Sequence, residues 1–167
     1  TGLATAYYDS VPLVCFTGQV SRPLIGNDAF QEVDIVGITR SITKYGVMVK
    51  NRDDLGRIIK EAFYIARSGR PGPVVIDLPK DVMAELGDPE YPSEVNIRGY
   101  KPNTMAHVGQ LKRAIKMLNK AKRPLFLVGG GVKISHATEE FTELVNITNV
   151  PVVTTIMGRG AISTNHP

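Results

Sequence analysis

The chain has 167 residues, of which 43% are hydrophobic and 22% are charged, and its formal net charge is +4. This length accommodates one globular domain or parts of two, and no run approaches the roughly 20 apolar residues of a membrane span. The only cysteine, Cys15, excludes a disulfide framework and, inside an apolar run, indicates a buried thiol in a reducing compartment.

The positive charge does not by itself indicate a nucleic-acid partner. Six basic residues spread along one amphipathic helix and its exit, which favours a solvated helix face over a phosphate-binding stripe. These residues are Lys112, Arg113, Lys116, Lys120, Lys122 and Arg123. We therefore expect neither nucleic acid nor a membrane as a partner.

The first part of the chain predicts an α/β unit. Residues 3–9 have the pattern of a helix end, residues 11–16 that of a buried strand, and residues 42–49 that of an interrupted strand. From Asp53 onward, apolar residues recur with helical spacing along one stripe, and Arg67 closes that helix. A strand, a connection, a strand, a helix and a strand are the order of an α/β domain with a mostly parallel sheet.

The most informative stretch is SGRPGPVVIDLPKD, residues 68–81. Gly69 can end a helix in the left-handed conformation, and two prolines stiffen the turn that follows. Residues 74–78 are nearly all apolar, which predicts a strand covered on both faces. Arg70 and Lys80 lie at opposite ends of this strand, roughly 20–30 Å apart at about 3.3 Å per residue, so we expect them to serve different sites.

Residues 87–104 are rich in glycine and proline and lack periodicity, which predicts an extended linker. A second unit follows, with helical stripes in residues 108–118 and 141–148 and strands at residues 124–128 and 151–155. A helix, a strand, a glycine turn, a helix and a strand make half of a doubly wound domain. The predicted fold class is therefore α/β, with two partial doubly wound, mostly parallel-sheet domains joined by a linker.

The turn Gly129-Gly130-Gly131 is the best site that the residues alone indicate. It follows a strand and precedes a helix, where parallel sheets bind ligands and where glycines allow close approach to the backbone. The dinucleotide fingerprint fails because Ile134 occupies its last glycine position, so a tight turn and a nucleotide site are equal alternatives. Residues 154–158, TTIMG, end the neighbouring strand at the same edge and would complete a crevice.

The other candidates have ordinary structural interpretations on the residues alone. Residues 27–32 predict a capped helix start with Phe30 in the core. Arg70 fits a turn arginine that binds carbonyl groups, and Lys80 fits a solvated lysine beside Asp81. The three histidines lack metal-ligand spacing, so no metal site is predicted within the chain.

Several motifs, in matching order, resemble the acetohydroxyacid synthase (acetolactate synthase) family of thiamine-diphosphate enzymes. They are TGQV at 17–20, IGNDAFQE at 25–32, SGRPGPV and DLPKD within 68–81, the glycine triplet and TTIMG. The resemblance covers essentially the whole chain. Ser21 departs from it, because the family usually has proline there, which bears on inhibitor contacts of this loop rather than on cofactor contacts.

The resemblance implies catalytic roles in the first part of the chain. Gln31 matches a glutamine that lies at thiamine diphosphate and assists carboligation, and Phe30 matches a phenylalanine that shapes the substrate pocket. Lys80 matches a lysine of the channel to the active site, and Lys44 falls at another lysine of that channel.

The resemblance also implies an FAD site. Arg70 matches an arginine that contacts FAD, and Gly130, with its flanking glycines Gly129 and Gly131, matches the turn under the flavin nucleotide. The next flavin contacts would come from Thr155, Ile156 and Met157. The glutamate that activates thiamine diphosphate and the segment that holds Mg²⁺ lie outside this chain in such enzymes.

The implied protein is a fragment of an acetolactate synthase catalytic subunit, inactive by itself. Residues 1–86 would be the later part of the pyrimidine-binding domain, residues 87–104 the linker, and residues 105–167 the first part of the central FAD-binding domain. The parent would decarboxylate pyruvate and join the two-carbon unit to a second 2-oxo acid, for branched-chain amino-acid biosynthesis.

The resemblance further implies a homodimer or homotetramer, with or without a regulatory subunit, in the cytoplasm or in an organelle stroma or matrix. Two alternatives stay open. One is another thiamine-diphosphate enzyme, such as a pyruvate oxidase or a glyoxylate carboligase. The other is a non-catalytic nucleotide-binding module that uses the crevice at residues 129–131.

Overall fold

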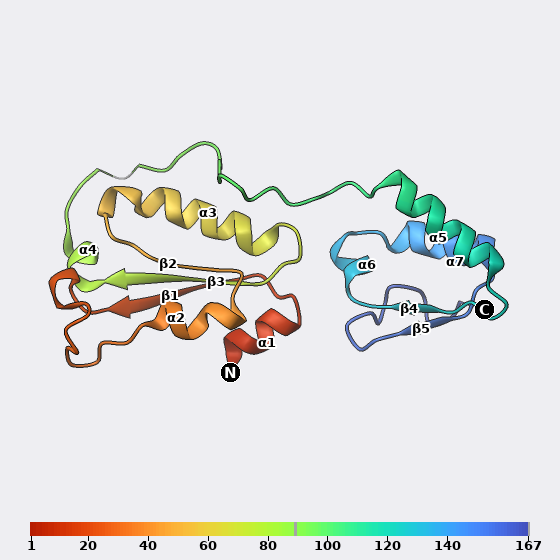
Figure 1. Ribbon diagram of the computed structural model, residues 1–167, viewed down its shortest axis with the longest axis horizontal. Coiled ribbons are helices and arrows are strands. Elements are labelled where there is room, and N and C mark those ends of the chain that lie inside the picture. Colours follow the sequence, from red (N-terminus) through yellow and green to blue (C-terminus); the bar gives the residue numbers. More distant parts are fainter. Residues whose placement is uncertain (89, 167) are drawn as a thin grey trace. The chain divides into compact units, whose positions relative to one another are not determined.

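The computed structural model describes residues 1–88 and 90–166. It divides into two compact units, Thr1–Thr104 and Met105–Pro167 (Figure 1). Each unit combines helices with its own parallel sheet, which confirms the predicted α/β class with parallel strands. Within the described residues, no helix is both long enough and apolar enough to cross a bilayer.

The first unit holds a three-stranded parallel sheet in the order β1-β3-β2. Its elements are α1 (Gly2–Tyr8), β1 (Leu13–Gln19), α2 (Ile35–Thr39), β2 (Tyr45–Met48), α3 (Leu55–Arg67), β3 (Pro73–Pro79) and α4 (Lys80–Ala84), with short 3-10 helices at Arg22–Leu24, Arg40–Ile42 and Arg52–Asp54. Helix α3 covers one face of the sheet, and α1 and α2 lie on the other (Figure 1). The central strand is therefore covered on both sides.

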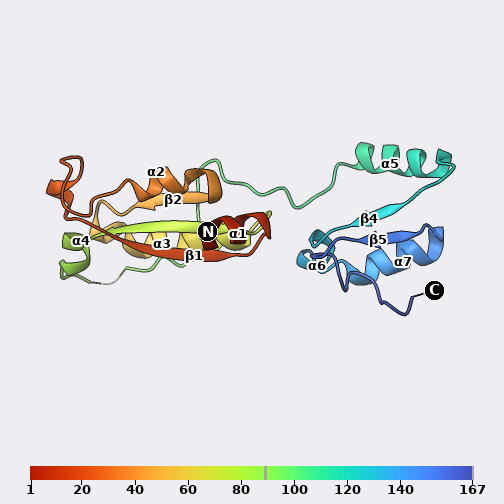
Figure 2. The ribbon, with the colours of Figure 1, turned by 90° about the horizontal axis from the view of Figure 1, so that it is seen from below.

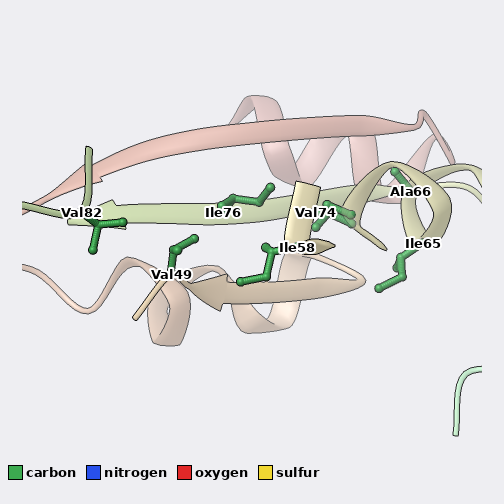
Figure 3. Packing of buried hydrophobic residues seen from close by; sticks show 8 residues of the cluster. Val49, Ile58, Ile65, Ala66, Val74, Ile76 and Val82 are labelled. Carbon is green, nitrogen blue, oxygen red and sulfur yellow. The ribbon is translucent and has the colours of Figure 1, made fainter. Parts of the chain in front are cut away.

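The hydrophobic core of this unit is built on β3. Val74 and Ile76 are wholly buried and pack with Val49, which follows β2, and with Ile58 and Ile65 of α3 (Figure 3). Burying each such side chain contributes about 1.5–3 kcal/mol. The prediction of a strand covered on both faces is confirmed.

Strand β1 differs from its prediction. It begins two residues later than expected and extends to Gln19, and Leu13 and Phe16 are 40% and 48% exposed. Cys15 is half-buried rather than buried. The reason is that β1 lies at the edge of the described sheet, where only one flank is paired.

The helix start predicted at residues 27–32 is wrong. This segment forms turns, the next α-helix begins at Ile35, and Phe30 is 88% exposed instead of lying in the core. Asp28 and Gln31 have φ angles of 53° and 61°, a left-handed backbone that interrupts a right-handed helix.

The segment before the second unit has no helix or strand in its described residues 85–88 and 90–104, yet its end is anchored. Ile97 and Tyr100 pack against the core of the first unit. The Tyr100 hydroxyl lies 3.0 Å from Ser68 Oγ and accepts a hydrogen bond of 3.1 Å from Lys44 Nζ.

The second unit has the predicted order of a helix, a strand, a glycine turn, a helix and a strand. Its elements are α5 (Val108–Lys120), β4 (Phe126–Val128), α6 (Gly131–Ile134), α7 (Thr138–Thr148) and β5 (Val152–Thr154). Figure 2 shows α5 on one side of β4 and β5, and α7 on the other. The two strands are parallel, and Val128 is in register with Thr154. Buried apolar residues are few among those described here: Val128, Val145, Val150 and Ala161.

Candidate active site and comparisons

The carboxyl edge of the first sheet carries the main candidate site. Gln19, the last residue of β1, is in register with Pro79, the last of β3, so these strands end together. A cavity of about 500 Å³ lies at this edge, and another of about 440 Å³ lies at the opposite, amino end of the sheet. Residues of all three strands line it, together with the loop that follows β1. Ligands of parallel α/β sheets bind at this edge.

Arg22 ties the beginning of that loop to the neighbouring strand ends. Its backbone N–H and its Nε donate to the two carboxylate oxygens of Asp81 at 3.0 and 2.7 Å, and Nη1 donates to the Lys50 carbonyl at 2.9 Å. Its Nη2 also pairs with Glu85. The hydrogen bond from Arg22 lowers the pKa of Asp81, and that from Asp81 raises the pKa of Arg22.

Glu32 closes the loop on itself. Its carboxylate accepts hydrogen bonds from the backbone N–H groups of Gly26 and Ala29, the second at 2.9 Å. These bonds, that from Gly26 above all, lower the pKa of Glu32. Asn27 Nδ2 adds a bond of 3.1 Å to the Pro23 carbonyl. The Glu32 carboxylate therefore closes the loop by accepting hydrogen bonds from backbone N–H groups, as a capping side chain does at the start of a helix.

Phe30 and Gln31 lie at the exposed tip of this organised loop. Gly26 and Glu32, which flank the tip, line the cavity. The left-handed backbone of Gln31 costs about 1–3 kcal/mol for a residue other than glycine, and it lies directly before Glu32, whose carboxylate closes the loop. Such strain is concentrated at functional sites.

Lys80 belongs to the same edge of the sheet. It is exposed and is the first residue of α4, directly after the last residue of β3. Its neighbour Asp81 is bound by Arg22, so the carboxylate expected beside Lys80 has a different partner. The structure thus brings Phe30, Gln31 and Lys80 to one edge, and their catalytic roles stay predictions.

Arg70 lies at the opposite, amino end of β3. Its Nε donates to Ser10 Oγ at 2.8 Å, and its Nη2 donates to the carbonyl groups of Tyr7 and Tyr8 at 3.2 and 3.0 Å. The guanidinium carbon also lies 5.7 Å from the centre of the Tyr7 ring. Arg70 therefore fixes the C-terminal end of α1, which is the structural interpretation that the residues alone gave. A role at FAD is an additional prediction.

Lys44 lies at this amino end as well, apart from Lys80. Its ammonium group donates to the carbonyl oxygens of Ile65 and Ser68, the second at 2.6 Å, and to the Tyr100 hydroxyl. These carbonyl groups belong to the C-terminal end of α3, where a cation is favourable. The structure thus gives Lys44 a helix-capping role.

In the second unit, the ends of β4 and β5 lie side by side, as predicted. The Thr155 N–H donates to the Val128 carbonyl at 2.9 Å, and a Cβ on Gly130 would lie 3.2 Å from Met157 Cβ and from its carbonyl oxygen. The glycine turn therefore packs directly on the next loop. Ile156 is 86% exposed beside this contact.

Comparison with known proteins finds one matching family model and several similar proteins. The family described as "Thiamine pyrophosphate enzyme, central domain" matches residues 111–167. The chain is 50% identical over 170 residues to a probable acetolactate synthase large subunit of Methanococcus aeolicus, across 100% of the chain and 28% of that protein. Along its whole length the chain is similar to acetolactate synthases.

Other acetolactate synthases are similarly close. Identity is 50% over 166 residues to the acetolactate synthase of Mycobacterium bovis, and 48% over 168 residues to the isozyme 3 large subunit of Escherichia coli strain K12. Each alignment covers 99% of this chain and 27% or 29% of the relative. The chain thus spans less than a third of the length of these acetolactate synthases.

One polar cluster, around Asp77, was not predicted from the sequence. Asp77 is 1% exposed in the middle of the buried strand and lines the cavity at the carboxyl edge. It accepts hydrogen bonds from Thr17 Oγ1 at 2.7 Å and from Gln19 Nε2 at 3.1 Å. The sequence signal for this cluster is Asp77 itself, a single acidic residue in an apolar strand. A buried carboxylate needs hydrogen-bond partners, so polar side chains on a neighbouring strand could be expected.

Proposed function

We propose that the protein containing this chain is an acetolactate synthase catalytic subunit. It would decarboxylate pyruvate and join the two-carbon unit to a second 2-oxo acid, a step of branched-chain amino-acid biosynthesis. The observation that carries this proposal is identity of about 50% along the whole chain to relatives named acetolactate synthase. The arrangement at the carboxyl edge of the first sheet supports it.

We propose the following division of labour within the chain. Residues 1–86 form the later part of a pyrimidine-binding domain, residues 87–104 the linker, and residues 105–167 the first part of a central FAD-binding domain. Two observations support this division: the central-domain family match begins at residue 111, and the structure divides after Thr104.

The cavity at the carboxyl edge fits part of thiamine diphosphate. Its apolar lining includes Val33 and Met48, and its polar lining includes Asp34 and Lys50, which suits a flat ring with polar substituents. When bound, thiamine diphosphate supplies the stabilisation of a carbanion. The Gln31 amide can donate and accept hydrogen bonds at the exposed loop tip.

The neighbouring side chains have complementary proposed roles. Phe30 offers an apolar ring to the methyl group of a 2-oxo acid, and the Lys80 ammonium attracts its carboxylate. Mg²⁺ ligands would come from elsewhere in the parent. Residues 1–88 and 90–166 contain no group of three or more histidine, cysteine or acidic side chains placed to hold a metal ion.

FAD is the second proposed organic cofactor. The bonds of Arg70 to α1 use its Nε and Nη2 groups and leave the Nη1 donors for a flavin carbonyl or phosphate. The turn of Gly129, Gly130 and Gly131 would offer backbone N–H groups. Thr155, Ile156 and Met157 would supply further contacts, and the exposure of Ile156 and Met157 supports this assignment.

Partner subunits follow from the same relatives. Two of them are named large subunits, so we propose a smaller regulatory partner for the full-length protein. We also propose a homodimer or homotetramer of the catalytic subunit, located in the cytoplasm or in an organelle stroma or matrix.

The test is product formation by the purified full-length protein. With pyruvate, thiamine diphosphate and Mg²⁺, acetolactate should form, and omission of thiamine diphosphate should abolish it. The 167-residue chain alone should form none. Peroxide and acetyl phosphate from pyruvate, or tartronate semialdehyde from glyoxylate, would instead identify the alternative enzymes, and no turnover with FAD bound would favour a nucleotide-binding module.

A further inference from the structure

The side-chain NH₂ group and oxygen of Gln19 are both hydrogen-bonded, and we call these three bonds together the tie. Its Nε2 donates to Asp77 Oδ2 at 3.1 Å and to the Val33 carbonyl oxygen at 2.8 Å. Its Oε1 accepts from the Val20 N–H at 2.9 Å. One side chain thus joins β1, the central strand β3 and the far end of the loop.

This tie joins the end of the loop to the sheet, at the Val33 carbonyl, which also accepts a local hydrogen bond of 2.9 Å from the Ile35 N–H of α2. Arg22 anchors the start of the loop to α4, and the Glu32 carboxylate binds only groups within the loop. Val33 lies two residues after Gln31, and its bond to Gln19 connects that end directly to the sheet. Asp77 is 1% exposed, so the carboxylate that orients Gln19 is itself immobilised by the core.

An amide of this length makes all three bonds. A carboxylate in its place could accept but not donate, an apolar side chain could do neither, and asparagine is one methylene shorter. The strained backbone at Gln31 makes the tie consequential, because a left-handed residue relaxes when its surroundings stop holding it.

We propose that Gln19 is a positioning residue, which holds the Phe30–Gln31 tip over the carboxyl-edge cavity by tying Val33 to the buried Asp77. The tie itself is independent of the reaction. Its consequence for catalysis rests on the proposed function of Gln31 in carboligation.

The first measurement is hydrogen–deuterium exchange of residues 26–34 in the full-length protein without substrate. Gln19→Met should accelerate exchange in this loop about two- to tenfold, the effect of losing ordinary hydrogen bonds. The matched control is Thr17→Val, which removes the other bond to Asp77, 2.7 Å long, and leaves the loop contact intact. It should not change loop exchange. Gln19→Asn, whose amide is one methylene shorter, should accelerate exchange as Gln19→Met does. It replaces Gln19→Met in the experiment if Gln19→Met does not fold.

The second measurement is the fraction of consumed pyruvate recovered as acetolactate. It should fall in Gln19→Met and stay at the wild-type value in Thr17→Val. Unchanged loop exchange in both Gln19 variants, or equal acceleration in Thr17→Val, would overturn the tie. Faster exchange with an unchanged product fraction would overturn the positioning role. A wild-type protein that forms no acetolactate, with the exchange result intact, would refute the proposed function and leave the tie standing.

Discussion

Replacing Arg70 separates its structural role at the end of α1 from its proposed role in binding FAD. In the structure its guanidinium donates three hydrogen bonds to Ser10, Tyr7 and Tyr8 and lies against the Tyr7 ring. Arg70→Ala removes all of them. Because the side chain is exposed, each interaction is screened: a cation at a helix C-terminus contributes about 0.3–1 kcal/mol and an exposed cation–π contact about 0.5–1 kcal/mol. The total is about 1–2 kcal/mol.

The expected result is local opening of the end of α1. A loss of about 1–2 kcal/mol corresponds to exchange about five- to thirtyfold faster. The reporting amides are those of Asp9 and Val11, which donate to the Thr5 and Ala6 carbonyl groups at 2.9 and 2.8 Å. The assay is hydrogen–deuterium exchange of the full-length protein without FAD.

Arg67→Ala is the matched control, since it truncates an exposed arginine at the end of α3, and it should leave α1 unchanged. The flavin absorbance retained by each variant is measured in parallel, and Arg70→Ala should also lower it. Unchanged exchange at α1 in Arg70→Ala would refute the structural reasoning. Unchanged flavin retention would remove Arg70 from the proposed FAD site.

Two further predictions concern the loop and the second unit. Because the pKa of Glu32 is lowered, its carboxylate stabilises the loop above the ordinary value of 4.5, and this stabilisation is lost as the pH falls through the lower pKa of the folded state. Protection of the Gly26 and Ala29 amides against hydrogen exchange, corrected for intrinsic exchange, should therefore disappear on acidification. Protection that persists well below the folded pKa would contradict this prediction. Gly158→Ala should lower the thermal midpoint of the full-length protein, because its Cβ would lie 2.2 Å from the Val128 carbonyl oxygen, a clash that costs about 1–3 kcal/mol. Gly131→Ala, whose Cβ meets nothing within 4 Å, is the control, and equal midpoints would contradict the prediction.

The core of the first unit could be predicted because its signals are local. The stripe that includes Ile58 and Ala62 repeats with the helical period, and residues 74–78 form an apolar run between turn residues. Both patterns depend only on neighbours in sequence. They led to α3 and β3 and to the burial of Ile58 and Ala62, although Phe63 of the predicted stripe is 48% exposed.

The loop at the candidate site could not be predicted in the same way. Its polar residues suit a helix cap as well as a self-bonded loop, and the choice depends on the positive φ angles at Asp28 and Gln31. The partner of Gln19 lies 58 residues away on β3, a distance over which no sequence period operates. The identities of Phe30, Gln31 and Lys80 as candidates came from the family resemblance, and the structure added their common edge.

The central claim is that the loop after β1 carries part of a carboligase site. Its most direct test is the rate of acetolactate formation from pyruvate by full-length Gln31→Ala, with Gln110→Ala on α5, another exposed glutamine, as the control. Losing a hydrogen bond to a charged group costs about 1.5–3 kcal/mol, so Gln31→Ala should lower the rate roughly ten- to a hundredfold while flavin stays bound. A wild-type rate in Gln31→Ala, or an equal fall in Gln110→Ala, would contradict the account.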